Sequence, residues 1–556
     1  MKNKMPVGID DFKKLVEKDY YLVDKTDFIK DFLDDHSDVT LITRPRRFGK
    51  TLTLSMLRYF FTLREASENR KLFEDLAVAR AGEEYMAYQG TRPVIFLTLK
   101  DVKASSWESC LEQIKIEMSD VYNEFHELAS SDKLSPLQKK IFDNILNRAS
   151  LRGDLEKSLY FLSQFLTAHY GQKVILLIDE YDAPIQTAWE YGYYDQAIMF
   201  FRNFLGAALK TNPSLDFAVL TGVLRISKES IFSALNNLKV SSVLYGSYPN
   251  VMGFTRKEIT KMADDLGHAD KIAEIREWYD GYDFSGIEIY NPWSVINYFD
   301  EGCTTRPYWV NTSGNAILNE LMRRIDDTRR EELTTLLKGG TITAPINETV
   351  LYSEIKSSRI ALYMMLVISG YLKCVEKFFR HGKPWGRLAI PNKEIHALFE
   401  DEVLSHASAH RDISFLYAML DAMLVGNTND FAKNLQKILL ENAGIHDTAK
   451  YPEAFYNGLF LGFSLLLTED YEVKSNGESG YGRFDMAFIP LDNTKPGVVL
   501  EFKRAASENE LDKKIAEGLA QIKEKEYLTI LRQKGVTEIW QYGVAFCGKQ
   551  VKMARG

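Results

Sequence analysis

The chain has 556 residues, more than the roughly 250–300 at which a single hydrophobic core stops growing, so two to four domains are expected. Hydrophobic residues make up 45% and charged residues 26%, which is typical of a folded globular protein and excludes a disordered one. The net charge of -8 excludes a bulk polyanion binder of the histone kind, so any nucleic-acid contact has to use local basic patches.

The four cysteines lie far apart and form no CxxC pair, which argues against a zinc site or a disulfide framework and fits a reducing compartment. The N-terminus has no apolar stretch of signal-peptide length, and the longest apolar runs, such as ALYMMLVISGYL, are shorter than a membrane span. We therefore expect a cytoplasmic protein without membrane contact.

From residue 39 onward, short β-rich runs alternate with helical stretches. Strands alternating with helices predict a parallel sheet covered on both faces, so the first domain, residues 1–260, is expected to be α/β. The predicted strands are VTLIT (39–43), PVIFLTL (93–99), KVILLID (173–179) and DFAVLTG (216–222), and the predicted helices include residues 50–61 and 195–210.

The stretch TRPRRFGKTLTL, residues 43–54, lies between the first strand and the first long helix, and its basic residues (Arg44, Arg46, Arg47 and Lys50) indicate a bound anion. A strand, such a loop and a helix N-terminus together can cradle phosphates, with Lys50 on the β- and γ-phosphates and Thr51 on Mg²⁺. The full pattern is G-x-x-x-x-G-K-[ST], and Arg44 stands where its first glycine belongs. A helix N-terminus that merely carries Lys-Thr is the alternative.

Two further signals follow in chain order. VILLIDEYDAP is an apolar strand that ends in Asp179, which could hold Mg²⁺ through water, and Glu180, which could polarise the attacking water. AVLTGVLRISKES ends a strand at Thr221 and carries Arg225 and Lys228, which are placed to sense γ-phosphate charge, although Arg225 could equally pin its own loop. Two features fit the NTPase branch in which an extra strand sits between the Walker strands. One is the strand-like run at 93–99, which lies between the two motifs in sequence, and the other is Glu180 directly after Asp179.

The middle of the chain, residues 261–445, is mostly helical, with a short extended piece at GRLAIPNKEI before another helix. Helices followed by a small wing would suit a winged-helix-like element or a regulatory lid, but helix packing alone also explains the apolar spacing.

The last part, residues 446–556, predicts a compact α/β unit with a central hairpin. Asp485 lies on one strand, and Glu501 and Lys503 share a face of the next because side chains alternate along a strand. Two such acids can hold divalent metals that activate water for phosphodiester hydrolysis, while the lysine orients the nucleophile. Glu453 is the expected further metal carboxylate, and Gln521 could contact substrate or support the site, as could Tyr527. A charged ladder on a solvent-facing strand is the alternative.

A run of motifs from MPVGIDDF through RPRRFGKT, LLIDEYDAP, LTGVLRISKESIFSALNN and WYDGYDF to YWVNTSGN resembles the bacterial AAA-ATPase-like family that is usually fused to a PD-(D/E)XK nuclease-like domain. The resemblance extends along nearly the whole chain, and it makes Arg44 a family trait of the loop. It implies a P-loop NTPase domain, a helical middle region and a restriction-endonuclease-like domain. The expected nucleotide-binding residues are Arg46, Arg47, Phe48, Gly49, Lys50, Thr51, Leu52, Asp179 and Thr221, with Glu180 and Arg225 as catalytic residues.

These signals predict an ATPase switch coupled to a metal-dependent nuclease, with ATP and Mg²⁺ as cofactors and Mn²⁺ as a second option in the nuclease site. The expected partners are nucleotide and nucleic acid, with DNA favoured. The sequence leaves open whether the chain forms a homo-oligomer. One alternative is an NTP-gated signalling or scaffold protein whose C-terminal domain only binds nucleic acid. Another is a DNA-translocating motor, which the sequence disfavours because it shows no second motor domain or helicase signature.

Overall fold

The computed structural model describes residues 4–225, 232, 235–309, 316–323, 325–348, 354, 358–408, 412–442, 459, 461–479, 482–547 and 550–556. The chain forms two compact units. The first comprises Met1–Gly314 and Thr341–Ile395, and the second comprises Asn315–Gly340 and His396–Gly556. Among the described residues, no helix combines the length and the apolar character needed to cross a membrane.

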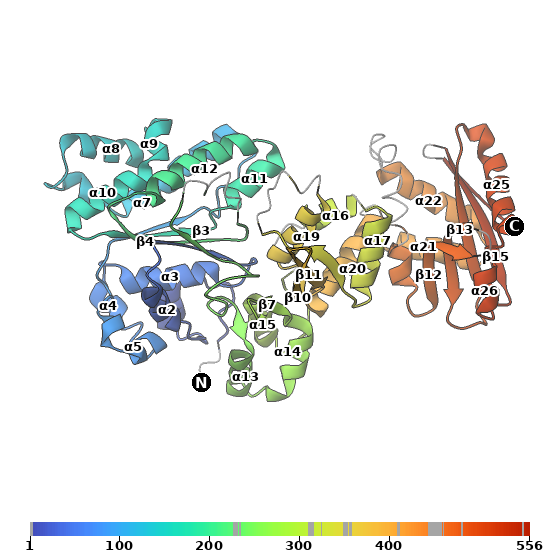
Figure 1. Ribbon diagram of the computed structural model, residues 1–556, viewed down its shortest axis with the longest axis horizontal. Coiled ribbons are helices and arrows are strands. Elements are labelled where there is room, and N and C mark those ends of the chain that lie inside the picture. The colour runs from blue at the N-terminus through green and yellow to red at the C-terminus, as the bar shows by residue number, and fades with distance from the viewer. Residues whose placement is uncertain are drawn as a thin grey trace. The chain divides into compact units, whose positions relative to one another are not determined.

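The first unit is built on a five-stranded, all-parallel sheet with the strand order β2-β3-β4-β1-β5 (Figure 1). Every residue of β1 and β3 is buried, as expected when helices cover both faces of a parallel sheet. The prediction of an α/β domain is therefore confirmed. The strands are β1 (Val39–Thr43), β2 (Val94–Thr98), β3 (Val174–Asp179), β4 (Leu215–Gly222) and β5 (Leu238–Ser241).

The strand order places β4 between β1 and β3. An extra strand thus separates the two motif-bearing strands, but it is 215–222 and not the earlier run 93–99, which forms β2 at the edge beside β3. Parallel strands end at the same edge of a sheet, so the residues that follow β1, β3 and β4 meet there.

Helix α3 (Lys50–Phe61) packs on one face of this sheet, and α10 (Ser158–Tyr170) and α12 (Tyr194–Leu209) pack on the opposite face (Figure 1). The other helices of this part are α1 (Phe12–Glu17), α2 (Asp27–Asp35), α4 (Ala66–Arg70), α5 (Ala77–Ala81), α6 (Glu83–Met86), α7 (Trp107–Asn123), α8 (Pro136–Leu146), α9 (Arg152–Glu156) and α11 (Ala183–Tyr191).

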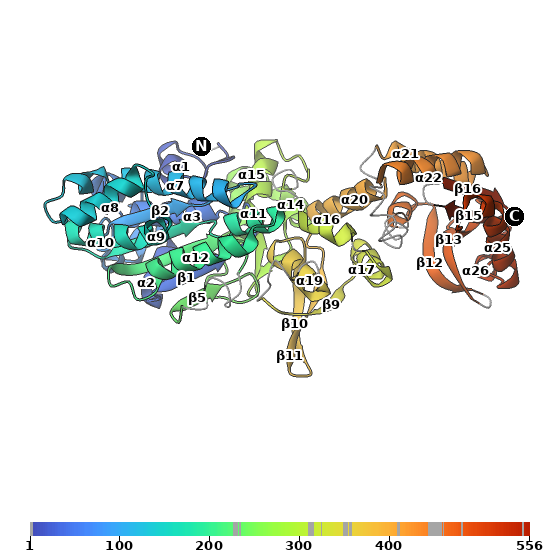
Figure 2. The same cartoon turned by 90° about the horizontal axis from the view of Figure 1, so that it is seen from above.

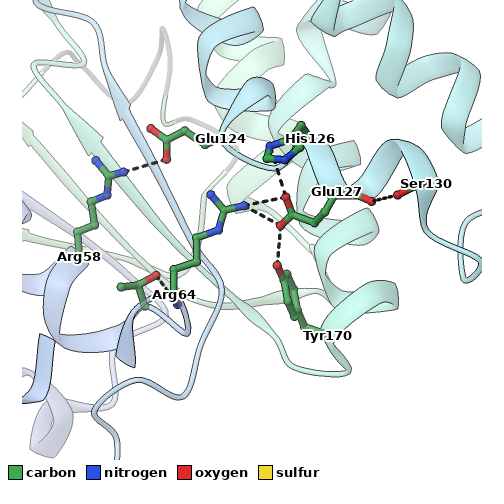
Figure 3. Close-up of polar contacts among 8 residues, drawn as sticks. Arg58, Arg64, Glu124, His126, Glu127, Ser130 and Tyr170 are labelled. Carbon is green, nitrogen blue, oxygen red and sulfur yellow. Dashed lines mark hydrogen bonds and ion pairs between the residues drawn. The ribbon is translucent and has the colours of Figure 1, made fainter. Parts of the chain in front are cut away.

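Charged contacts tie the far end of α3 to the helical layer on the other face (Figure 3). The Arg64 guanidinium donates to both carboxylate oxygens of Glu127 at 2.6 and 2.9 Å, and the Tyr170 hydroxyl donates to Glu127 at 2.6 Å. Arg58 pairs with Glu124 at 2.9 Å. These contacts hold the end of α3 that is remote from the loop at residues 44–49.

The chain after β5 packs against that loop. Strands β6 (Phe254–Thr255), β7 (Tyr282–Phe284) and β8 (Ile287–Tyr290) form a small antiparallel sheet, and the helices here are α13 (Arg256–Asp265), α14 (Ile272–Tyr279) and α15 (Pro292–Asp300). Their apolar side chains share one core with Tyr290 and Met5. Another antiparallel sheet follows, with β9 (Ile342–Pro345), β10 (Lys373–Arg380) and β11 (Lys383–Ala389) beside α19 (Arg359–Ile368).

The second unit holds a five-stranded mixed sheet in the order β12-β13-β14-β15-β16, in which only β14 and β15 are parallel. On β15, Gly543 contacts α25 and the neighbouring Tyr542 bonds to Met423 in α21, so these helices cover opposite faces. The strands are β12 (Tyr471–Ser479), β13 (Gly482–Pro490), β14 (Gly497–Arg504), β15 (Ile539–Cys547) and β16 (Gln550–Arg555). The helices are α16 (Ala316–Arg323), α17 (Asp327–Leu337), α20 (Lys393–Ala407), which begins in the first unit, α21 (Ser414–Leu424), α22 (Thr428–Asn442), α25 (Leu511–Glu524) and α26 (Thr529–Gln533).

Candidate functional site

Arg44 does not face a bound anion, and that expectation from the charge cluster is corrected. Its side chain is fully buried and donates to the carbonyls of Ser241 at 3.0 Å and Tyr248 at 2.6 Å, with the Phe284 ring 4.9 Å away. Burial lowers the pKa of Arg44 to about 9, so the guanidinium stays charged at neutral pH. Arg44 therefore ties the start of the loop to the chain beyond β5.

Lys50 begins α3 directly after Gly49, whose φ of 86° is the left-handed conformation that favours glycine. Its ammonium donates to the carbonyl oxygens of Pro45 at 3.0 Å and Arg44 at 3.3 Å, and only 4% of the residue is exposed. Burial lowers the pKa of Lys50, although the carboxylate of Glu180 acts in the opposite direction. The lysine thus lies folded over its own loop, where an anion would compete with two carbonyls for it.

Asp179, the last residue of β3, is bonded to residues of α3 and β4. Its carboxylate accepts hydrogen bonds from the hydroxyls of Thr51 and Thr221, each at 2.6 Å. Because β4 lies between β1 and β3, Thr221 reaches Asp179 from one side while Thr51 reaches it from α3. Burial raises the pKa of Asp179, and the two hydroxyl donors offset this only in part. Hydroxyl and carboxylate oxygens are the ligands that Mg²⁺ prefers, so Thr51 and Asp179 fit that ion.

The residues after Asp179 fix the chain beyond β4. Glu180 has a φ of 49°, which is uncommon for a residue other than glycine and turns the chain at the end of β3. Asp182 is buried and accepts from the backbone N–H groups of Val223 and Leu224 at 2.9 and 2.8 Å. Gly222 leaves the room for this contact, because a Cβ there would lie 2.5 Å from the Asp182 carboxylate. Burial raises the pKa of Asp182 to about 6. Asp182 is not among the residues that the sequence motifs predicted.

The remaining loop residues are held by neighbouring elements. Arg46 donates to Gln186 at 3.0 Å, and the exposed Arg47 has its guanidinium 4.4 Å from the Trp293 ring of α15. Phe48 is buried against Tyr282 and Phe284 of β7, so it is a packing residue. Leu52 lies half-buried in the first turn of α3.

A buried carboxyl supports the loop from further along the chain. Glu394 accepts from the Ser294 hydroxyl at 2.8 and 2.9 Å and from the Trp309 backbone N–H at 2.7 Å, and burial raises its pKa to about 7. The Trp309 indole N–H donates to the Arg46 carbonyl at 3.1 Å. Sequence reasoning missed this contact because its partners are 263 residues apart; the YWVNTSGN motif was the only signal.

Arg225 lies half-buried just beyond β4, and its charge acts on the nearby Glu348, whose pKa is raised by burial. Its neighbour Leu224 is anchored by the Tyr181 hydroxyl at 2.6 Å. The described contacts do not bring Arg225 to Asp179 or Lys50, so its role stays a prediction. Lys228 lies outside the described residues.

The C-terminal unit brings Asp485, Glu501 and Lys503 together where β13 and β14 part. The ladder pairs Met486 with Leu500, and one step further the Asp485 carboxylate accepts the Phe502 backbone N–H at 2.7 Å. The Lys503 ammonium pairs with Glu501 at 2.8 Å. Lys503 also donates to Gln521 at 2.7 Å, and Gln521 in turn donates to the Tyr527 hydroxyl at 2.9 Å. Gln521 and Tyr527 therefore position the lysine.

Both carboxyl groups are costly to ionise in this arrangement. Glu501 is 2% exposed, and burial together with the neighbouring Asp485 raises its pKa to about 7. Burial also raises the pKa of Asp485. Within the described part of the chain, the second oxygen of Glu501 has no hydrogen-bond donor. A divalent cation would supply the missing partner, so the two residues fit such an ion. Glu453, the expected third carboxylate, lies outside the described residues.

Two regions of the chain match known family models. Residues 6–232 match the family model described as "Predicted AAA-ATPase", and residues 451–555 match the PD-(D/E)XK nuclease superfamily. The chain joins an AAA-ATPase-like domain to a PD-(D/E)XK nuclease-like domain. The resemblance inferred from the motifs is therefore confirmed, and the AAA-ATPase-like match contains Lys50, Asp179 and Thr221 while the nuclease-like match contains Asp485 and Glu501.

A relative in Azotobacter chroococcum mcd 1, described as an uncharacterized protein in the vnfD 5' region, is 27% identical over 503 residues, covering 88% of this chain and 87% of the relative. Among solved structures, a signal transduction ATPase with numerous domains and a tetratricopeptide repeat sensor from Pyrococcus horikoshii is 13% identical. That match covers 81% of this chain, which spans 58% of the other protein, with a TM-score of 0.26.

Proposed function

We propose that the protein is an ATP-hydrolysing switch whose nucleotide state controls a metal-dependent nuclease acting on nucleic acid, with DNA favoured. The observation that carries the ATPase half is the convergence of Thr51 and Thr221 on the buried Asp179, next to Lys50. We further propose the domain limits 1–260, 261–445 and 446–556, a cytoplasmic location and the possibility of a homo-oligomer.

At the ATP site, Lys50 would leave the Pro45 and Arg44 carbonyls and donate to the β- and γ-phosphates. Thr51 and Asp179 would hold Mg²⁺, which offsets phosphate charge when bound. Glu180 would accept a proton from the attacking water, and Thr221 would keep Asp179 oriented during turnover. Arg225 would stabilise the charge that develops on the transferred phosphoryl group.

At the C-terminal site, Asp485 and Glu501 would hold Mg²⁺ or Mn²⁺ through their carboxylate oxygens, with Glu453 as a further ligand. The metal, when bound, supplies an activated water and stabilises the leaving oxygen. Lys503, held by Gln521 at 2.7 Å, would orient the nucleophile and offset the charge that develops on the phosphate.

The test is incubation of the purified protein with single- and double-stranded DNA and RNA, with Mg²⁺ or Mn²⁺, in the presence and absence of ATP. We expect phosphate release from ATP and metal-dependent cleavage of a nucleic acid, with DNA cleaved most readily. Absence of cleavage from every substrate, while nucleic acid still binds, would remove the nuclease half of the proposal.

The second candidate is an NTP-gated binding or scaffold protein. The ion pair between Lys503 and Glu501 at 2.8 Å favours it, because this contact neutralises the carboxylate without a metal. Some proteins of nuclease-like folds act without cleavage, and fold alone does not decide between the two.

A further inference from the structure

The outer end of the β10–β11 hairpin stands clear of its sheet. The third strand, β9, pairs only with residues 385–388 of β11, and the Ile346 N–H adds one bond to Pro384. Beyond that point, among the residues that the structure describes, the ladder joins the two hairpin strands only to each other, down to Arg380 opposite Lys383. Figure 2 shows β10 and β11 projecting from the body of the first unit.

The turn at the end of this hairpin is a tight two-residue connection. His381 and Gly382 both have positive φ, at 51° and 72°, the combination that defines a type I′ turn and matches the twist of the strands. A hairpin closed in this way presents its end residues at fixed positions, so a ligand would not have to order a loose loop.

The hairpin strands carry five basic residues and one acid. The acid, Glu376, is already paired with Arg387 at 2.9 Å across the strands. Arg380 and Lys383 are directly opposite each other and both are exposed. Like charges in facing positions destabilise a hairpin, so this pair is unfavourable until an anion lies between or beside them. The basic residues of the two strands are Lys373, Lys377, Arg380, Lys383 and Arg387.

Aromatic residues alternate with these cations. Phe379 is 80% exposed at the end of β10 and lies on the face opposite the cation pair, because side chains alternate along a strand. On the face that carries the cation pair, Trp385 lies two pairs closer to the sheet, with the Arg380 guanidinium 5.4 Å from its ring. Cations that contact phosphates beside aromatic rings that stack on bases are the combination used by nucleic-acid-binding surfaces.

We propose that the outer end of the β10–β11 hairpin is a nucleic-acid-binding element, with Arg380 and Lys383 on backbone phosphates at one face and Phe379 against a base at the other. The inference rests on the proposed function in one respect, since that function requires a nucleic-acid substrate. It adds a binding element in the first unit, outside the nuclease-like match at 451–555. An anionic lipid surface would also attract these cations, but one exposed ring offers little apolar area for insertion into a membrane.

The test uses the full-length protein in EDTA, so that binding is measured without cleavage. Fluorescence anisotropy with a labelled single strand and the matching duplex gives Kd at about 50 and about 200 mM salt. The double substitution Arg380→Glu with Lys383→Glu should raise Kd about tenfold or more and reduce the salt slope by about 2, because two phosphate contacts are lost. The matched control, Lys18→Glu with Lys71→Glu, reverses two exposed charges elsewhere in the first unit and should leave Kd within about twofold.

A second variant keeps the test independent of charge. Phe379→Ala should weaken single-strand binding about tenfold and duplex binding less, because base stacking is lost. ATP binding and circular dichroism of each variant check that the first unit is folded.

Equal Kd values for the charge-reversed hairpin and its control would overturn the proposal, as would failure to bind any nucleic acid. Hairpin-dependent binding to phosphatidylserine vesicles without nucleic-acid binding would replace it with a lipid surface. Hairpin-dependent binding in a protein that never cleaves with Mg²⁺ or Mn²⁺ would support the hairpin while removing the nuclease half of the proposed function.

Discussion

The two candidate sites place a lysine beside buried carboxylates in opposite ways. In the AAA-ATPase-like domain both carboxylate oxygens of Asp179 accept hydrogen bonds from neutral hydroxyls, and the Lys50 ammonium donates to loop carbonyls. In the nuclease-like domain Lys503 pairs directly with Glu501, whose other oxygen accepts no hydrogen bond from the described residues. The first site is closed on itself and has to rearrange for its ligand. At the second, this oxygen of Glu501 would take a cation without such a rearrangement.

The two sites would therefore respond differently to ligand binding. At the first site, phosphate must draw Lys50 from two carbonyls, so binding and rearrangement of the loop are coupled. At the second, burial and the neighbouring Asp485 make the ionised form of Glu501 costly and raise its pKa to about 7. A bound cation would relieve this cost.

The largest expected effect is at the nuclease-like site. Asp485→Ala, Glu501→Ala and Lys503→Ala should each lower metal-dependent cleavage by a factor on the order of 10³ or more, and combining them should add little because they act as one unit. ATP hydrolysis should persist in all three. Asp512→Ala, which removes an exposed carboxylate of the same unit, is the control and should cleave normally. A parallel loss of ATP hydrolysis would show that the sites are not separate.

Next comes Lys50, the proposed phosphate-binding lysine. Lys50→Ala should weaken nucleotide binding by about 10- to 100-fold, because a charged hydrogen bond to phosphate is lost. Titration with a fluorescent ATP analogue measures this, with Lys71→Ala as a control at an exposed position. A Lys50→Ala protein that binds like wild type would refute the phosphate-loop assignment.

Asp179→Ala should mainly impair Mg²⁺-dependent hydrolysis, and Glu180→Gln should bind ATP normally and hold it.

Arg225 tests whether the segment after β4 takes part in chemistry. Arg225→Ala should lower kcat more than nucleotide affinity, by about 10-fold or more, because transition-state charge exceeds ground-state charge on the transferred group. Steady-state ATP hydrolysis combined with equilibrium binding separates the two quantities. Equal losses in both would assign Arg225 to loop structure, in line with its position near Glu348.

A smaller effect is expected where Trp309 holds the loop. Trp309→Phe removes the indole N–H that donates to the Arg46 carbonyl but keeps an aromatic ring. A single hydrogen bond contributes about 0.5–1.5 kcal/mol net, so nucleotide affinity should fall by about 2- to 12-fold. Isothermal titration calorimetry measures it, and Trp278→Phe in the same unit should have no effect. Unchanged affinity in Trp309→Phe would mean that the contact does not position the loop.

The last prediction concerns pH. The pKa of Glu501 is raised from 4.5 to about 7, so the native state binds this proton more tightly than the unfolded chain. Its contribution to stability is present below about pH 4.5 and is lost as pH rises through about 7. In EDTA, the Tm of Glu501→Gln minus that of wild type should therefore grow by a few degrees from about pH 5 to about pH 8. Mg²⁺ or Mn²⁺ should narrow the difference at the higher pH. A pH-independent difference would contradict the raised pKa.

Local patterns predicted most of the elements that carry the sites. The strand at 39–43 has the predicted bounds, and the runs at 173–179 and 216–222 form β3 and β4 within one residue at each end. Apolar runs between helical stretches are a short-range signal, because both faces of a parallel strand are buried. The alternation of side chains along a strand likewise placed Glu501 and Lys503 on one face.

Tertiary structure alone decided which charges face a ligand. Arg44 and Lys50 belong to the same basic cluster in the sequence, yet Arg44 is turned into the protein by the carbonyls of Ser241 and Tyr248, about 200 residues away, and Lys50 covers the loop. Glu394 and Trp309 carried no charge pattern that could mark them. The order of β4 between β1 and β3 was not readable from chain order either. Composition and periodicity report on neighbours along the chain, whereas hydrogen bonds and burial depend on groups that only the folded chain brings together.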